Sequence, residues 1–172
     1  MDARPSSPDE VLDTTDPRQL KALAHPLRNR ILFALGPDGA TVSQLAKKLS
    51  TNKGNVAHHL AVLEGAELVR RGPRRQVRGG TEQYFVRAAR RLRTPVGSRS
   101  GHTAALLQAV AEEIEASPAE TLLNLRRIRL TRAQAAALSR HLERVVDELQ
   151  EAGPREADHG VLVSVFQSGQ AG

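Results

Sequence analysis

A dense group of arginine side chains is the strongest chemical signal in this sequence. Between residues 70 and 93 there are nine arginines and a single acidic residue. The net charge is −4 over residues 1–16, +12 over 17–94 and −2 over 95–172. Guanidinium groups at this density pair well with phosphate. The sequence therefore predicts a polyanion-binding block at 17–94, although charge alone fits a solvated basic face equally well.

Three polar side chains lie at the start of a predicted helix over about 53–66. The apolar stripe of this helix recurs at intervals of four and three, at Val56, Leu60 and Leu63. Lys53, Asn55 and His58 fall on the opposite face. An asparagine amide can pair bidentately with adenine, and a lysine can donate to guanine. These residues are candidates for reading base edges, against the alternative of ordinary helix surface.

The residue types offer little to catalysis or to metal binding. The chain has six histidines and no cysteine, which excludes disulfides, thiolate nucleophiles and cysteine-ligated metal centres. His58 and His59 are adjacent and diverge by roughly 100° around a helix, so they cannot face one metal ion. Glycine-rich phosphate loops and hydrolase motifs are missing from the sequence. We predict no catalytic residue, no metal and no cofactor, and leave open a metal held across a dimer.

A series of short elements must position the candidate residues. One helix begins after Asp16, and a second restarts at the His25-Pro26 break. Thr41 and Gln44 predict a capping box at the start of a short helix, and Asn52 is the expected N-cap of the helix over 53–66. A left-handed backbone in the intervening turn, at Ser50, would cost about 1 kcal/mol relative to glycine.

Two short strands joined by a basic loop at about 72–80 follow these helices. Two helices, a capped short helix, a tight turn, another helix and a basic hairpin are the order of a winged helix-turn-helix. In this arrangement the second helix of the motif enters the major groove. The hairpin reaches flanking phosphate or the minor groove.

Residues 20–87 resemble the ArsR-type winged-helix transcriptional regulators over about 40% of the chain. The segments that resemble the family are LKALAHPLRNRIL, VSQLAKKLSTNKGNVAHHLAVLEGAELV and TEQYFV, and the most specific piece is VAHHLAVLEGAELV. The chain departs from the family in lacking its metal-binding cysteine pair, and in having Glu67 where glycine is usual. The resemblance implies a dimeric DNA-binding repressor or activator.

The ends of the chain differ from this basic block. Residues 1–16 are predicted to be a flexible acidic arm, and 95–101 a linker. Residues 102–172 are predicted to form a C-terminal α+β dimerisation or effector module. It has helices at 102–117 and 132–151 and pairing strands at 125–130 and 161–166. Two helices and two short strands cannot bury both apolar helix stripes alone, so a second copy is expected to cover them.

The sequence thus predicts a mainly α fold with small β: a winged helix-turn-helix domain at 17–94 joined to the C-terminal module. The expected function is a sequence-specific, DNA-binding transcriptional regulator, a repressor, acting as a homodimer. The expected partners are double-stranded DNA and a second copy, and the sequence leaves open whether a small-molecule effector also binds. A protein–protein assembly scaffold is the alternative. With no apolar leader and no span-length apolar stretch, we expect a cytoplasmic location and no membrane partner.

The candidate site residues form two sets. The expected DNA contacts are Thr41, Ser43, Asn52, Lys53, Asn55, His58, His59, Arg74, Arg75, Gln76 and Arg78. The expected dimer contacts are Leu20, Leu23, Leu107, Val110 and Ile114.

Overall fold

A computed structural model describes residues 9–36, 38–77, 80–93, 101–118, 121–150, 152–153 and 156–167. The chain divides into two compact units, Met1–Thr121 and Leu122–Gly172. The helices and strands of the first unit are β1 (Asp9–Asp13), α1 (Pro17–Leu23), α2 (Pro26–Ala34), β2 (Ala40–Thr41), α3 (Val42–Lys48), α4 (Lys53–Gly65), β3 (Val69–Val77), β4 (Gly80–Arg87), β5 (Ala89–Arg93) and α5 (His102–Glu115). The one helix described in the second unit is α6 (Arg132–Asp147).

The break between α1 and α2 follows from a histidine and an asparagine. The Nδ1 atom of His25 accepts a hydrogen bond from the backbone N–H of Leu27 at 3.2 Å and so caps α2. The buried Asn29 amide donates to the backbone oxygen of Leu23 at 2.9 Å. These bonds satisfy backbone groups that a helix end leaves unpaired. The predicted restart at His25-Pro26 is confirmed.

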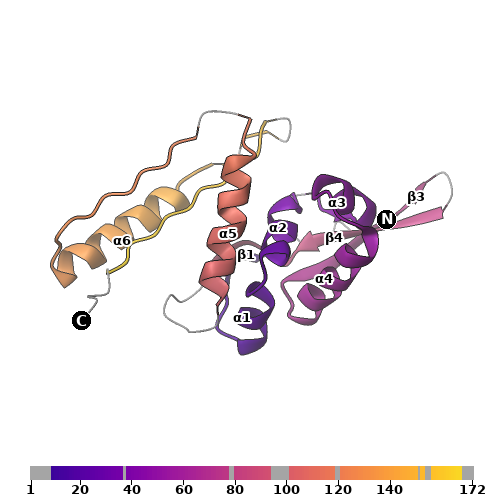
Figure 1. Cartoon of the computed structure of the whole chain (residues 1–172), viewed down its shortest axis with the longest axis horizontal. Coiled ribbons are helices and arrows are strands. Elements are labelled where there is room, and N and C mark those ends of the chain that lie inside the picture. The colour runs from indigo at the N-terminus through magenta and orange to yellow at the C-terminus, as the bar shows by residue number, and fades with distance from the viewer. Residues whose placement is uncertain are drawn as a thin grey trace. The chain divides into compact units, whose positions relative to one another are not determined.

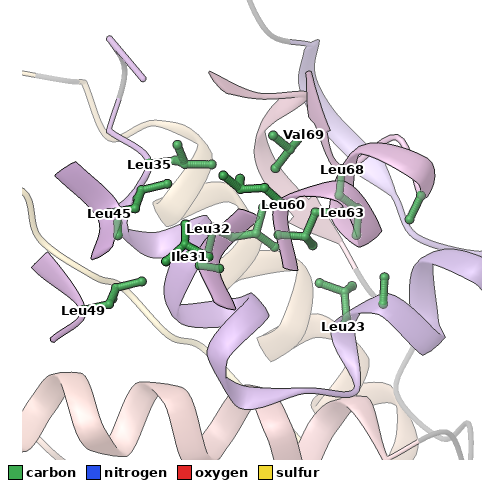
Figure 2. Packing of buried hydrophobic residues seen from close by; sticks show 14 of the residues in the cluster. Leu23, Ile31, Leu32, Leu35, Leu45, Leu49, Leu60, Leu63, Leu68 and Val69 are labelled. Atoms are coloured by element: carbon green, nitrogen blue, oxygen red, sulfur yellow. The ribbon is translucent and has the colours of Figure 1, made fainter. Parts of the chain in front are cut away.

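The core of the first unit is made almost entirely of aliphatic side chains. Leucines from α1 to α4 converge in one cluster with Leu68 and with Val69, the first residue of β3 (Figure 2). Within it Ile31, Leu45 and Leu63 are fully shielded from solvent. Val56 and Leu60 are also buried, as the predicted stripe of the 53–66 helix requires. This core fixes α3 and α4 against α2, and thereby fixes which face of α4 points outward.

A three-stranded sheet in the order β2-β4-β3 lies beside these helices, and β3 and β4 form a hairpin that projects beyond α3 and α4 (Figure 1). Gly39 precedes β2 with a φ of 74°, and a β-carbon there would approach the backbone oxygen of Phe85 to 2.3 Å. Only glycine fits this site, because a side chain would separate β2 from β4.

The N-terminal region differs from the predicted flexible arm. Residues 9–13 form β1, which pairs in parallel with β5, so that Leu12 lies opposite Leu92. The hydroxyl of the buried Thr14 donates to the backbone oxygen of Arg93 at 3.1 Å. The pairing joins segments some 80 residues apart, which local sequence patterns do not reveal.

The assignment of the 102–117 helix to the C-terminal module also requires correction. α5 belongs to the first unit, where it packs against α1 and α2 and buries Ala105 and Ala109. Arg30 of α2 pairs with Glu112 of α5 at 3.1 Å. Small side chains on one face of α5 allow this close approach, and leave its larger apolar residues on the other faces.

The second unit lacks the predicted β structure in its described residues. Residues 125–130 and 161–166 form no strand, and all of their side chains are exposed. α6 begins at a confirmed capping box between Thr131 and Gln134. None of its residues is buried, although its apolar residues share one side. Within the described ranges, no helix has the length and apolar character required to cross a membrane.

Candidate nucleic-acid interface

The start of α4 presents polar side chains to solvent. The Asn52 side chain accepts a hydrogen bond from the backbone N–H of Asn55 at 2.7 Å and caps the helix. Lys53 and His58 are both exposed. His58 lies opposite the buried stripe of α4, as predicted, whereas Lys53 is three residues from Val56 and seven from Leu60 and so lies nearer the stripe than predicted; it is exposed as the first residue of the helix. The positive end of the helix dipole and the Lys53 ammonium therefore lie at the same exposed end, which favours an anionic partner.

The Asn55 side chain is held in place before any partner binds. Its amide nitrogen donates to the Thr51 hydroxyl at 3.2 Å, and the residue is half-buried. The turn that contains Thr51 follows Ser50, which adopts a φ of 51°. The left-handed backbone considered for Ser50 is thus present. Ordering this amide in advance reduces the entropy lost when it makes a further hydrogen bond.

Sequence reasoning missed the small residues of the same face. Gly54, Ala57 and Ala61 are exposed on α4. Their spacing of three and four residues was a signal available in the sequence. Small side chains let a helix backbone approach a groove floor closely, and alanine methyl groups pack against the thymine methyl.

The two candidates near the start of α3 differ in accessibility. Thr41 is only 3% exposed, and its hydroxyl accepts a hydrogen bond from the backbone N–H of Gln44 at 3.3 Å. The Gln44 side chain in turn accepts from the backbone N–H of Thr41, so the predicted capping box is confirmed. Thr41 therefore serves to begin α3, and its side chain is not offered to DNA. Ser43, one residue into α3, is half-buried.

His59 also requires correction as a DNA contact. The residue is 6% exposed, and its ring lies 4.6 Å from that of His25 between centroids. Burial lowers the pKa of His59, and the neighbouring His25, Arg28 and His58 lower it further. Burial likewise lowers the pKa of His25, with Arg28 and His58 adding to the effect. His59 is a neutral packing residue between α4 and the start of α2.

The hairpin of β3 and β4 carries the basic residues of the predicted wing. Arg74, Arg75 and Gln76 are all exposed on β3. The Arg74 Nε donates to the Gln83 side chain at 3.0 Å, and the Arg75 guanidinium lies 4.7 Å above the centre of the Tyr84 ring. Cation–π contact of this kind orients a guanidinium without neutralising its charge.

A side-chain hydrogen bond also links the two strands near the far end of the hairpin. The Gln76 side chain accepts from the Thr81 hydroxyl at 3.0 Å across the strand pair. Arg78, the fourth predicted contact, lies outside the described residues. The strands run to Val77 and from Gly80, so the basic residues predicted in a loop at 72–80 lie mostly within paired strands.

The predicted dimer contacts do not share one kind of environment. Leu23 is 5% exposed and belongs to the core, so it is not available to a second copy. Leu20 is half-buried on α1. On α5, Leu107 is 48% exposed, and Val110 and Ile114 are half-buried. The outer face of α5 therefore retains apolar surface after α5 has packed on α1 and α2.

Helices α2, α3 and α4 are followed by the basic two-stranded hairpin of β3 and β4, and α4 presents exposed polar side chains. This arrangement defines a winged helix-turn-helix domain. Comparison with protein families agrees with this class: residues 23–72 match a family described as a helix-turn-helix domain. The matched residues lie within the segment 20–87, whose sequence resembles the ArsR-type regulators. No curated protein is significantly similar in sequence to the chain.

Several solved structures are similar to the chain at low TM-scores. One is the homodimeric winged helix-turn-helix DNA-binding domain of Mb0332 from Mycobacterium bovis, described as a possible ArsR-family regulator. It has 27% identity, a TM-score of 0.35, and coverage of 62% of this chain and 85% of that chain. Streptococcus pneumoniae FabT in complex with DNA has 17% identity, a TM-score of 0.28 and coverage of 70% and 71%. RV1404 from Mycobacterium tuberculosis has 15% identity, a TM-score of 0.30 and coverage of 79% and 86%.

Proposed function

We propose that this protein is a sequence-specific DNA-binding transcriptional regulator, with α4 in the major groove and the β3–β4 hairpin on flanking DNA. The exposed polar face at the start of α4, fixed by the buried stripe behind it, is the observation on which the proposal depends. Lys53, Asn55 and His58 supply donors and acceptors for base edges. Gly54, Ala57 and Ala61 supply a smooth surface between them.

The hairpin complements this helix face with charge. Arg74 and Arg75 are exposed, held by neighbouring side chains, and not engaged by a carboxylate in any described contact. Arginines presented in this way neutralise phosphates and release counterions, which gives affinity without sequence preference. Base contacts from α4 and phosphate contacts from the hairpin therefore divide specificity and affinity between two elements.

The regulator acts in this proposal as a homodimer and as a repressor. The apolar outer face of α5, with Leu107, Val110 and Ile114, supports a contact between copies. A two-fold dimer presents two α4 helices to half-sites about 34 Å apart. A dimer bound where polymerase must contact the DNA would block transcription, and this is the repressor role proposed here.

Selection of genomic fragments on the purified full chain, followed by footprinting, tests this proposal. We expect a shared sequence with two-fold related half-sites, protected in footprints, and an affinity that falls linearly with the logarithm of salt concentration. Lys21→Ala is a matched control, since it removes one exposed charge from α1, outside the proposed surface. Failure to enrich any shared sequence would refute sequence-specific recognition and favour the assembly scaffold.

A further inference from the structure

The second unit contains apolar surface that the described residues of the unit do not cover. The described apolar residues of 122–130 and 161–166 are between 37% and 90% exposed. In the first of these segments, Leu122, Leu123 and Leu125 are the most exposed, at 90%, 79% and 75%. Isolated exposed leucines are ordinary, but a unit without one buried residue among those described is not.

The segment 161–166 has the composition of an interior strand. In an extended chain, Val161, Val163 and Val165 point to one side, and Leu162 and Phe166 point to the other, with Ser164 between them. All five are 37% to 63% exposed, so both sides are uncovered. A strand that is apolar on both faces is normally covered by further layers on both sides. One helix, α6, can cover only one of them.

α6 supplies an apolar face of matching character. Ala135, Leu142 and Val146 are half-buried, and Leu138 and Val145 on the same side are 38% and 45% exposed. The opposite side, which includes Ala137, is exposed. Because the unit has 51 residues and its described part builds no core of its own, its helix and extended segments lack the area that a stable fold needs.

The charges of the second unit suit a second copy of the same unit. The residues 122–172 carry seven arginines and six acidic residues, so two copies repel each other little. The charges are also segregated: residues 126–132 contain four arginines and no acid, whereas 143–158 contain all six acids and two arginines. A two-fold axis can place the basic part of one copy beside the acidic part of the other.

We propose that the second units of two copies fold together into one sheet-and-helix body. The 161–166 segments of the two copies lie side by side and antiparallel at its centre, and each α6 covers the sheet. The uncharged segment occupies the interior of the sheet, and the arginine-bearing 122–130 segment occupies each edge, where charge is tolerated. This inference rests on the proposed homodimer but not on DNA binding, and it assigns the principal contact between copies to the second unit.

Sedimentation of the full chain at micromolar concentration, without DNA, tests the assignment. We expect twice the 18.7 kDa mass of one chain. Leu142→Glu and Val163→Glu should each reduce it to the mass of one chain. The control Ala137→Glu places the same charge on the opposite side of α6 and should leave the dimer intact. A monomeric full chain, or dimers that persist in both variants, would overturn the proposal.

A cysteine scan keeps the test independent of folding defects. Because the chain has no cysteine, single cysteines at positions 162 to 165 can form a disulfide only between copies. If the 161–166 segments of two copies pair antiparallel about a two-fold axis, one of these four positions lies opposite the same position in the other copy. At least one variant should therefore oxidise to a covalent dimer. Ala137→Cys should not. No cross-link at any of the four positions would refute the central pairing.

The outcomes separate this inference from the proposed function. A dimer that depends on Leu142 and Val163 supports the shared body even if fragment selection yields no DNA sequence. Conversely, a shared DNA sequence with a dimer insensitive to both substitutions refutes the shared body and leaves DNA recognition intact.

Discussion

Arg71 and Glu64 join the base of the hairpin to the last turns of α4. The Nε of Arg71 donates to the Glu64 carboxylate at 2.8 Å, with the side chains 61% and 33% exposed. An ion pair at this exposure contributes little to stability, because water screens it and two long side chains lose freedom. The pair therefore links the hairpin to α4 without contributing much to the free energy of unfolding.

Replacement of Glu64 by glutamine should accordingly change the free energy of unfolding by less than about 1 kcal/mol. Truncation of the neighbouring core residue, Leu60→Ala, should cost about 2–5 kcal/mol, since Leu60 is 1% exposed. Urea denaturation of both variants measures the difference. Equal reductions in stability would show that the ion pair is a principal source of it.

The double replacement Lys53→Ala and Asn55→Ala should remove preference for the selected DNA sequence. Each good base contact discriminates by about 1–3 kcal/mol, so specific affinity should approach that for random DNA. Circular dichroism should remain unchanged, because Lys53 is exposed and the Asn52 cap uses only the backbone N–H of residue 55. Unchanged footprints in the double variant would contradict the major-groove assignment of α4.

Neutralising the hairpin arginines should act differently. With Arg74→Ala and Arg75→Ala, and with Arg78→Ala added, affinity should fall by a similar factor on every DNA sequence. The slope of log affinity against log salt should shrink by roughly one unit for each phosphate that the variant no longer neutralises. Tyr84→Phe is a useful control, since it retains the ring beneath Arg75. Wild-type affinity and slope in the triple variant would exclude the hairpin from the DNA surface.

Local signals in the sequence were sufficient to predict where three of the helices begin. The capping residues Thr41, Asn52 and Thr131 each mark a helix start correctly, because side-chain capping depends only on residues two or three positions away. The stripe of α4 likewise needs no knowledge of distant segments. The helix cap and the apolar stripe are therefore enough to predict that Lys53 and His58 are exposed.

Features that depend on distant partners were not predictable in this way. β1 can be recognised as a strand only from its pairing with the distant β5. The burial of His59 on α4 likewise depends on a distant residue, because His25 at the start of α2 packs against its ring. Leu23 has the spacing of an interface residue but is covered by the core. Residues 125–130 and 161–166 have β-type composition, yet composition does not specify which edge a strand pairs with.

The backbone at Ser50 offers a test of strain in the turn between α3 and α4. Its φ of 51° is unfavourable for a residue with a side chain. Ser50→Gly should raise the free energy of unfolding by up to about 1 kcal/mol, less the entropy that glycine adds to the unfolded chain. Ser50→Val should lower it, since β-branched residues avoid this region. Ser43→Gly is the control, because Ser43 lies within α3, where glycine should lower the free energy of unfolding in the same urea assay. If Ser43→Gly raised it instead, a stabilising effect of Ser50→Gly could not be attributed to relief of strain at Ser50.

The pair His25 and His59 predicts that stability falls in mild acid. Burial lowers the pKa of both imidazoles in the folded protein below the ordinary value of 6.5. The Nδ1 of His25 also accepts the N-cap hydrogen bond of α2, which a proton on that nitrogen would abolish. A histidine whose pKa is lowered by folding contributes fully to the free energy of unfolding above pH 6.5. That contribution is lost as the pH falls through the pKa of the histidine in the folded protein.

We therefore expect the free energy of unfolding to be constant above about pH 7 and to decrease from about pH 6.5 downward. His59→Leu, which keeps an apolar side chain at the buried site, should flatten this decrease relative to the wild type. His141→Gln should retain it, because His141 is exposed on α6, outside the His25–His59 contact. Urea denaturation at half-unit steps of pH measures all three curves. A His59→Leu curve parallel to that of the wild type would assign the acid sensitivity to other groups.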